Sequence, residues 1–152
     1  MAKPKQTLIT KIKLDIDHFK HFIILVTAII KRNGKFLLVQ RRPESKTFPE
    51  FWQLPEGKLE LGEQPVETLK RELNEELGCK VKKVKFVEAL TLTFPIGSQE
   101  MHLLRIIAKV TLEGKIKLSS EHSRYLWLTK QALLKHPGLV PGIKEIIKSK
   151  NV

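Results

Sequence analysis

Residues 57–79 read GKLELGEQPVETLKRELNEELGC, and this stretch decides how the fold of the whole chain is interpreted. Its larger apolar residues recur at spacings of three and four: Val66, Leu69, Leu73 and Leu77. This spacing indicates one apolar helix face. Pro65 suits the first turn of a helix, and Gly78 suits its end. The stretch therefore predicts an amphipathic helix over residues 65–77.

Three glutamates of this helix share one face. At about 100° per residue, Glu72, Glu75 and Glu76 fall within about a third of the circumference, beside the leucines. Such like-charged neighbours destabilise a helix by about 0.2–0.5 kcal/mol per pair, so they need solvent or a cation. Glutamate-rich faces are commonly only solvated. If a cation binds, Mg²⁺ is the natural one because it prefers oxygen ligands, and Mn²⁺ could substitute for it.

The same stretch resembles the Nudix box, Gly-x5-Glu-x7-Arg-Glu-U-x-Glu-Glu-x-Gly-U, in which U is a bulky aliphatic residue. All seven fixed identities are present: Gly57, Glu63, Arg71, Glu72, Glu75, Glu76 and Gly78. Only the last U differs, and we expect the small apolar Cys79 there to be buried. Looser matches flank the box over residues 40–52 and 121–128. The resemblance implies an α/β fold, the Nudix-type α/β/α sandwich with a central mixed sheet.

The resemblance also implies roles for the box residues. It implies that Glu72, Glu75 and Glu76 bind the metal, with Glu72 and Glu75 also catalytic. Arg71 and Glu63 would brace the loop against the helix, since an arginine–carboxylate pair can bind through two parallel hydrogen bonds. Gly57 and Gly78 complete the structural positions of the motif.

A general base can come from outside the box, and Glu100, Glu121 and His122 are the candidates. Glu121 ranks first because residues 121–128 resemble a Glu-His-x-x-Tyr-x-Trp-Leu pattern of several Nudix hydrolases. The alternative for these aromatic residues is packing within a strand. Each of the three candidate bases could equally be an ordinary surface residue.

Residues before the box suggest how a substrate would bind. Arg41 and Arg42 could face phosphate, and Trp52 could border a base, although core packing explains Trp52 equally well. Many relatives read Leu-Pro-Gly-Gly where this chain has Glu56 before Gly57. A positive φ at this position would strain a glutamate, so the loop geometry there is open.

The leading interpretation is magnesium-dependent hydrolysis of the pyrophosphate linkage in a nucleoside diphosphate derivative. The expected substrate is a nucleoside triphosphate, oxidised or not, cleaved to the monophosphate and pyrophosphate. The pattern over residues 121–128 also suits dinucleoside polyphosphate hydrolases, and Pro95 suits ADP-ribose hydrolases. A rival from another class is a non-catalytic Nudix-like domain that binds nucleotide or RNA, which the net charge of +12 favours. Retention of all three metal glutamates speaks against that rival, so nucleic acid is not the favoured partner.

Length and composition predict one domain over residues 1–152, with residues 1–10 as a flexible tail. A single cysteine excludes an intramolecular disulfide. The sequence has neither an 18-residue uncharged apolar stretch nor a signal peptide, which predicts a cytoplasmic protein without membrane contact. A homodimer is plausible from the family resemblance.

The remaining elements follow from turn signals and periodicity. Asn33 and Gly34 predict a hairpin between strands at residues 22–31 and 35–41. A long loop is expected over residues 42–61. Further strands are expected at these ranges: 83–94, 100–112 and 124–128. Thr129 can cap a short helix to residue 135, and Pro141 can open a last helix.

Overall fold

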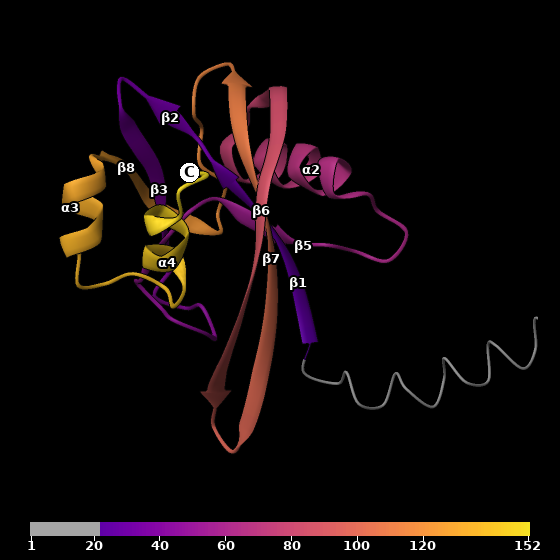
Figure 1. The fold of residues 1–152 in the computed structure, drawn as a ribbon. Helices are drawn as coiled ribbons and strands as arrows, with labels where there is room; N and C mark the ends of the chain where they lie inside the picture. Colours follow the sequence, from indigo (N-terminus) through magenta and orange to yellow (C-terminus); the bar gives the residue numbers. More distant parts are fainter. Residues whose placement is uncertain (1–21) are drawn as a thin grey trace, which may run out of the picture.

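The computed structural model describes residues 22–152, which form two sheets flanked by helices (Figure 1). The elements follow in chain order: β1 (Phe22–Ile29), β2 (Lys31–Arg32), β3 (Lys35–Arg41), β4 (Trp52–Gln53), β5 (Glu56–Lys58), α2 (Pro65–Leu77), β6 (Lys80–Ile96), β7 (Gln99–Glu113), β8 (His122–Leu128), α3 (Lys130–Lys135) and α4 (Ile143–Lys148). The predicted tail, residues 1–10, lies outside the described residues. No helix within residues 22–152 is long and apolar enough to cross a membrane.

The two sheets divide the strands between them. The first has the order β5-β1-β7-β6 and is mixed, because β1 runs parallel to β7 while the other neighbours are antiparallel. The second contains β2, β3 and β4 in that order, and β8 pairs with the free side of β3. A mixed sheet with flanking helices confirms the predicted α/β fold class.

The predicted first hairpin is partly wrong. Strand β1 ends at Ile29 and joins the first sheet, whereas only the two-residue β2 pairs with β3 in the second sheet. The turn itself lies where it was predicted, at Asn33 and Gly34, whose φ angles are 51° and 72°. A continuous apolar run cannot reveal from sequence that the chain leaves one sheet and enters another within two residues.

Helix α2 begins and ends at the predicted residues. Pro65 occupies its first turn, and the preceding Gln64 N–H donates to Glu67 Oε2 at 2.7 Å, which caps the helix start. Gly78 ends the helix in the left-handed conformation, with φ of 63°, and its N–H donates to the Asn74 carbonyl. The leucines of the apolar face are buried against β1 and β7.

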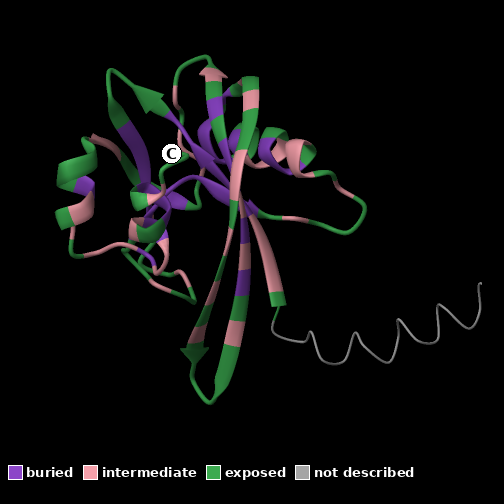
Figure 2. Cartoon of the chain, in the orientation of Figure 1, coloured by how far each residue is buried: buried purple, intermediate pink, exposed green. Residues whose placement is uncertain are grey.

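Two apolar clusters hold the layers together, as the buried strands and helix faces in Figure 2 show. The first lies between α2 and the sheets and contains the fully buried Cys79, as expected for this position. The second lies under α3 and α4, where Ile143, Ile146 and Ile147 of α4 are at most 1% exposed. Burial of these side chains is the main stabilising contribution to the fold.

The C-terminal helices agree closely with prediction. Thr129 caps α3, since its Oγ1 accepts a hydrogen bond from the Ala132 N–H at 3.2 Å. Helix α4 begins two residues after Pro141. Strands β6 and β7 extend beyond their predicted ends and form a long hairpin that turns at Gly97 (Figure 1).

The predicted loop over residues 42–61 is not continuous. It contains β4 and β5, which have two and three residues. Strands this short carry no recognisable periodicity, because a period of two needs several residues to appear. Strand β5 pairs with β1 and thereby places the start of the box at the edge of the first sheet.

Candidate active site

A cavity of about 930 Å³ lies beside α2. Strands β1, β5 and β7, the far end of the β6–β7 hairpin and the loop after β3 also contribute to its lining. Its carboxylates are Glu44, Glu56, Glu60, Glu72, Glu75, Glu76 and Glu121. Its cationic residues are Arg41, Arg42, Lys58, Arg71 and Arg105. The rest of the lining is largely apolar, so the cavity combines a carboxylate-rich wall with an apolar one.

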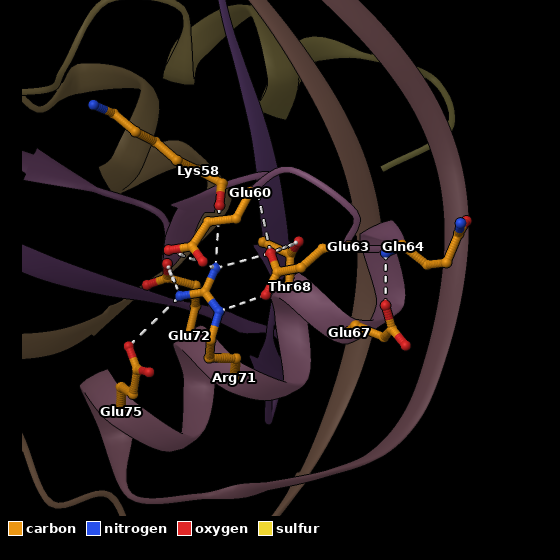
Figure 3. A network of polar contacts seen from close by, with 9 residues as sticks. All are labelled: Lys58, Glu60, Glu63, Gln64, Glu67, Thr68, Arg71, Glu72 and Glu75. Carbon is orange, nitrogen blue, oxygen red and sulfur yellow. Dashed lines mark hydrogen bonds and ion pairs between the residues drawn. The ribbon is translucent and has the colours of Figure 1, made fainter.

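Arg71 organises the carboxylate-rich wall (Figure 3). Its Nε donates to Glu63 Oε1 at 2.6 Å and its Nη2 donates to Glu63 Oε2 at 3.0 Å. Its Nη1 donates to Glu72 Oε1 at 2.6 Å, and its Nη2 also reaches the Lys58 carbonyl at 3.2 Å. The hydrogen bonds from Arg71 lower the pKa of Glu63 to about 2, with a further contribution from Thr68. The loop before α2 is thus tied to the helix through one guanidinium.

Gly57 allows β5 to approach α2 closely. A Cβ at this position would lie 2.0 Å from Cγ of Glu72 and 2.6 Å from its Oε1. No other residue type fits without moving Glu72, which explains a glycine here although its φ is not positive.

Glu76 is the most perturbed group of the site. Its side chain is 3% exposed, and its Oε2 has no hydrogen-bond partner among residues 22–152. Burial raises the pKa of Glu76 to about 9, and the neighbouring charges of Glu72, Glu121 and Glu56 add to this effect. Burial also raises the pKa of Glu72, although Arg71 opposes the shift.

The three box glutamates differ in their surroundings. Glu76 is buried, the Glu72 side chain is 15% exposed, and the Glu75 side chain is 57% exposed, with its Oε2 3.6 Å from Arg71 Nη1. Within residues 22–152, no three His, Cys, Asp or Glu side chains converge as a ready ligand set. Magnesium does not require one, because it usually keeps several waters and binds one or two carboxylates.

The residues present nevertheless fit a divalent cation. An unpartnered carboxylate oxygen of Glu76 lies near the like charges of Glu72 and Glu121, and a cation would relieve this repulsion. All the donors are hard carboxylate oxygens, which suit Mg²⁺ or Mn²⁺ rather than a soft metal.

Two of the three candidate bases reach the cavity. Glu121 is exposed and lines it, next to the start of β8. His122 also lines it but is buried, and its Nδ1 has no partner among the described residues. Burial, assisted by the charge of Arg41, lowers the pKa of His122 to about 4, so its imidazole is neutral at pH 7. Glu100 lies near the turn of the β6–β7 hairpin, outside the cavity lining.

Of the three predicted substrate-binding residues, the structure brings two to the cavity. Arg42 is exposed and lines it. Arg41 also lines it but is engaged by the protein: its Nε donates to the Thr47 carbonyl at 2.8 Å and its Nη1 to Gln53 Oε1 at 3.2 Å. Trp52 lies elsewhere, 7% exposed within the second apolar cluster. The pairing of β4 with β3 turns Trp52 toward the core, which favours packing over contact with a base.

Comparison with known proteins agrees with this geometry. The NUDIX domain model matches residues 20–149. The chain belongs to the Nudix family. A crystal structure of MutT protein from Methanosarcina mazei Go1 superposes on this Nudix protein with a TM-score of 0.70 at 28% identity, covering 84% of this chain and 91% of that one.

Two curated relatives differ in how much of their length the chain covers. Nucleoside triphosphatase NudI of Escherichia coli O139:H28 (strain E24377A / ETEC) is 27% identical over 118 residues, 72% of this chain and 84% of NudI. Octanoyltransferase of Myxococcus xanthus is 31% identical over 126 residues, 80% of this chain but only 34% of that protein. This chain therefore spans about a third of the latter's length. Together with the box, the family match and the similarities to NudI and to MutT make it a MutT-like Nudix pyrophosphohydrolase.

One pair of residues in this Nudix protein was missed by sequence reasoning. Glu56, which replaces the glycine of many relatives, forms a buried ion pair with Arg105 of β7, with Arg105 Nε 3.0 Å from Glu56 Oε2. Glu56 is not among the described non-glycine residues with positive φ, so the strain that a positive φ would have caused does not arise. The signal was an arginine inside the otherwise apolar run at residues 103–108.

Proposed function

We propose that this Nudix protein is a magnesium-dependent hydrolase that cleaves a nucleoside triphosphate to the monophosphate and pyrophosphate. The observation that carries the proposal is the unpartnered Glu76 Oε2, which lies beside other carboxylates in a cavity that also presents the cationic Arg42 and Lys58. Similarity to a nucleoside triphosphatase and to MutT supports this substrate class.

Each group has a role in the proposal. Glu72, Glu75 and Glu76 hold the metal, which when bound neutralises phosphate charge and lowers the pKa of its water. Arg71 fixes Glu72 through the 2.6 Å hydrogen bond from its Nη1, so this carboxylate does not need to reorganise when substrate enters.

Residues across the cavity complete the proposed reaction. Glu121 accepts the proton of the attacking water, because it is the exposed carboxylate that faces the buried Glu76 from another element. Arg42 and Lys58 attract the triphosphate through charge. The neutral imidazole of His122 lines the same cavity and can accept or donate a hydrogen bond there.

The test is product analysis with purified protein, Mg²⁺ and a panel of nucleoside triphosphates, oxidised dGTP, ADP-ribose and dinucleoside polyphosphates. A monophosphate plus pyrophosphate from a triphosphate is the expected result. Hydrolysis of only ADP-ribose or a dinucleoside polyphosphate would replace the triphosphate with that substrate. Glu75→Gln should lower turnover by orders of magnitude, while Glu100→Gln, outside the cavity lining, should retain it.

Turnover that is unaffected by Glu75→Gln and by chelation of Mg²⁺ would contradict the metal assignment. A binding module would instead show no turnover and an affinity for RNA that falls steeply with salt.

A further inference from the structure

A surface formed by β2, β6, β7 and α3 carries five lysines, all of them exposed. We name them together the lysine face: Lys31, Lys83, Lys85, Lys109 and Lys130. None of the five lines the cavity. Nine of the fourteen glutamates of the described chain lie elsewhere, within residues 44–76. The lysine face therefore concentrates positive charge away from the carboxylate-rich wall of the candidate active site.

Strand pairing places three of these lysines on one side of the first sheet. Lys85 of β6 lies directly opposite Lys109 of β7, and Lys83 is two residues from Lys85 on the same face. Val84, between the two β6 lysines, packs against the first apolar cluster under α2, so the lysines point to the other side. Lys109 is also the register partner of Ile29 in β1, which belongs to the second apolar cluster. The three lysines therefore lie on the side of α3 and α4.

Lys31 and Lys130 extend this group from neighbouring elements. Lys31 Nζ lies 4.6 Å from the centroid of the Phe36 ring, and Phe36 belongs to the second apolar cluster. Lys31 is thus on the same side of the fold as Lys109. Burial and the positive charges of Lys109 and Lys130 lower the pKa of Lys31, so these three ammonium groups are close enough to repel one another.

No carboxylate of the described chain pairs with the lysine face. Within residues 22–152 every ion pair between side chains is made by an arginine. Two glutamates flank the lysines on the hairpin strands: Glu88 accepts a hydrogen bond from Ser149, and Glu113 lies opposite Lys80 at the open end. Like charges directly opposite each other on paired strands destabilise a sheet. A bound anion would relieve this repulsion.

The lysine face suits a polyanion better than a single nucleotide. Its charges lie on an exposed surface, whereas a nucleotide site encloses most of its ligand in a pocket. Lys83 and Lys85 are two residues apart along β6, which separates them by about 6.6 Å. An extended nucleic acid strand repeats its phosphates at a comparable spacing. Several phosphates can therefore contact several lysines at once and release their counterions.

A membrane surface fits the lysine face less well. Anionic lipids attract lysines, but firm attachment also needs apolar side chains that enter the bilayer. Phe86 is the exposed large apolar residue next to Lys85, and its cross-strand neighbour Ala108 packs in the first apolar cluster. Phe86 is therefore on the α2 side of the sheet, away from the lysine face.

We propose that the lysine face binds the phosphate backbone of a nucleic acid strand, independently of base sequence. Lysines contact phosphates, and phosphate contacts carry no sequence information. The surface is separate from the cavity, so the inference goes beyond the proposed hydrolysis and does not depend on it. Binding at the lysine face accompanies chemistry in the cavity rather than replacing it, which is compatible with the presence of all three box glutamates.

The direct test is fluorescence anisotropy of labelled oligo(dT) and oligo(dC) of about 12 nucleotides, titrated with the whole protein in a metal chelator. If the five lysines each neutralise one phosphate, the slope of log K against log salt concentration should be about −3.5. Affinity should then fall about 100-fold between about 50 and about 200 mM salt. The two oligonucleotides should bind within roughly three-fold of each other, because the backbone is read and the bases are not.

A triple variant assigns the binding to the lysine face. Lys83→Gln with Lys85→Gln and Lys109→Gln removes three phosphate contacts. The salt slope should become shallower by about 2, and affinity at about 0.1 M salt should fall about 100-fold. The unfolding midpoint should be unchanged or higher, since the repulsion between Lys85 and Lys109 is removed. If this variant does not fold, Lys85→Glu alone places an opposite charge across from Lys109 and should also weaken binding.

A matched control removes the same net charge from other elements. Lys70→Gln with Lys148→Gln and Lys150→Gln changes three exposed lysines of α2 and the C-terminal segment and should bind within a few-fold of wild type. Equal weakening in both triple variants would reduce the effect to net charge and overturn the proposal. Absence of oligonucleotide binding at about 50 mM salt, or binding only to phosphatidylserine vesicles, would overturn it as well.

Failure of this inference is distinguishable from failure of the proposed function. Binding is measured without metal and without turnover, so a protein that binds both oligonucleotides but hydrolyses no triphosphate retains the lysine face and loses the proposed reaction. Hydrolysis without oligonucleotide binding overturns the role of the lysine face and leaves the reaction in place.

Discussion

Replacing Glu76 with glutamine should stabilise the metal-free protein and at the same time abolish hydrolysis. The carboxylate is buried without a partner for Oε2, and its pKa is raised from 4.5 to about 9. A carboxyl with a raised folded-state pKa binds its proton more tightly in the folded than in the unfolded chain. Stability is therefore highest below pH 4.5 and is lost as pH rises from 4.5 toward 9.

The size of the effect follows from this shift. Between pH 4.5 and pH 7 each pH unit costs about 1.4 kcal/mol of unfolding free energy, so the penalty at pH 7 is about 3 kcal/mol. This penalty at pH 7 depends little on the folded-state pKa of Glu76 as long as that pKa exceeds 7. The new amide also lacks a full set of partners, which costs about 1–2 kcal/mol. The net gain for Glu76→Gln at pH 7 is about 1–2 kcal/mol.

The assay is urea unfolding of wild type and Glu76→Gln in a metal chelator at pH 7 and at pH 4.5. The gain should be present at pH 7 and shrink at pH 4.5, because there the unfolded chain also binds the Glu76 proton about half of the time and the cost of protonation on folding almost disappears. Glu75→Gln is the control, because its side chain is 57% exposed and should change stability by less than about 0.5 kcal/mol. Added Mg²⁺ should stabilise wild type more than the Glu76 variant. A variant that is no more stable than wild type at pH 7, or a gain independent of pH, would refute the reasoning.

Further substitutions probe other parts of the site. Gly57→Ala should displace Glu72, since the new Cβ would lie 2.0 Å from its Cγ. Initial rates should show a clear loss of kcat, whereas thermal unfolding should show a smaller effect on the free energy of unfolding than on the activation free energy. Arg71→Lys loses the bidentate hydrogen bonds to Glu63 and should reduce both turnover and the unfolding midpoint. If neither turnover nor the midpoint changes, Arg71 does not hold the loop against the helix. Glu121→Gln should lower kcat by about 10²–10⁴-fold with an unchanged midpoint, whereas Glu100→Gln should leave kcat unaltered, and equal effects in these two variants would remove Glu121 as the base.

Sequence reasoning located the helix of the box to the residue because its signals are local. Apolar spacing, the early Pro65 and the terminal Gly78 all act within the helix itself. The division of strands between two sheets could not be read in this way, because pairing of β1 with β7 joins residues about 80 positions apart. The same limit hid β4 and β5, whose few residues are held by their partners rather than by their own pattern.

The candidate site shows the same division. The seven identities of the box were legible because they lie in one short stretch. The sequence did not show that Trp52 lies in the core, because its position depends on the pairing of β4 with β3. It also did not show that Glu100 lies outside the cavity, because this depends on the length of the β6–β7 hairpin.

The sequence by itself determined the family, the carboxylate-bearing helix and the candidate metal residues, since these follow from residue types at fixed local spacing. Only the tertiary structure decided that Glu76 is buried while Glu75 is exposed, because burial depends on which elements cover each turn of the helix. Only the structure joined Glu56 to Arg105, which are 49 residues apart. A buried charge requires a partner of opposite sign, and the fold selects that partner by bringing distant strands into one sheet.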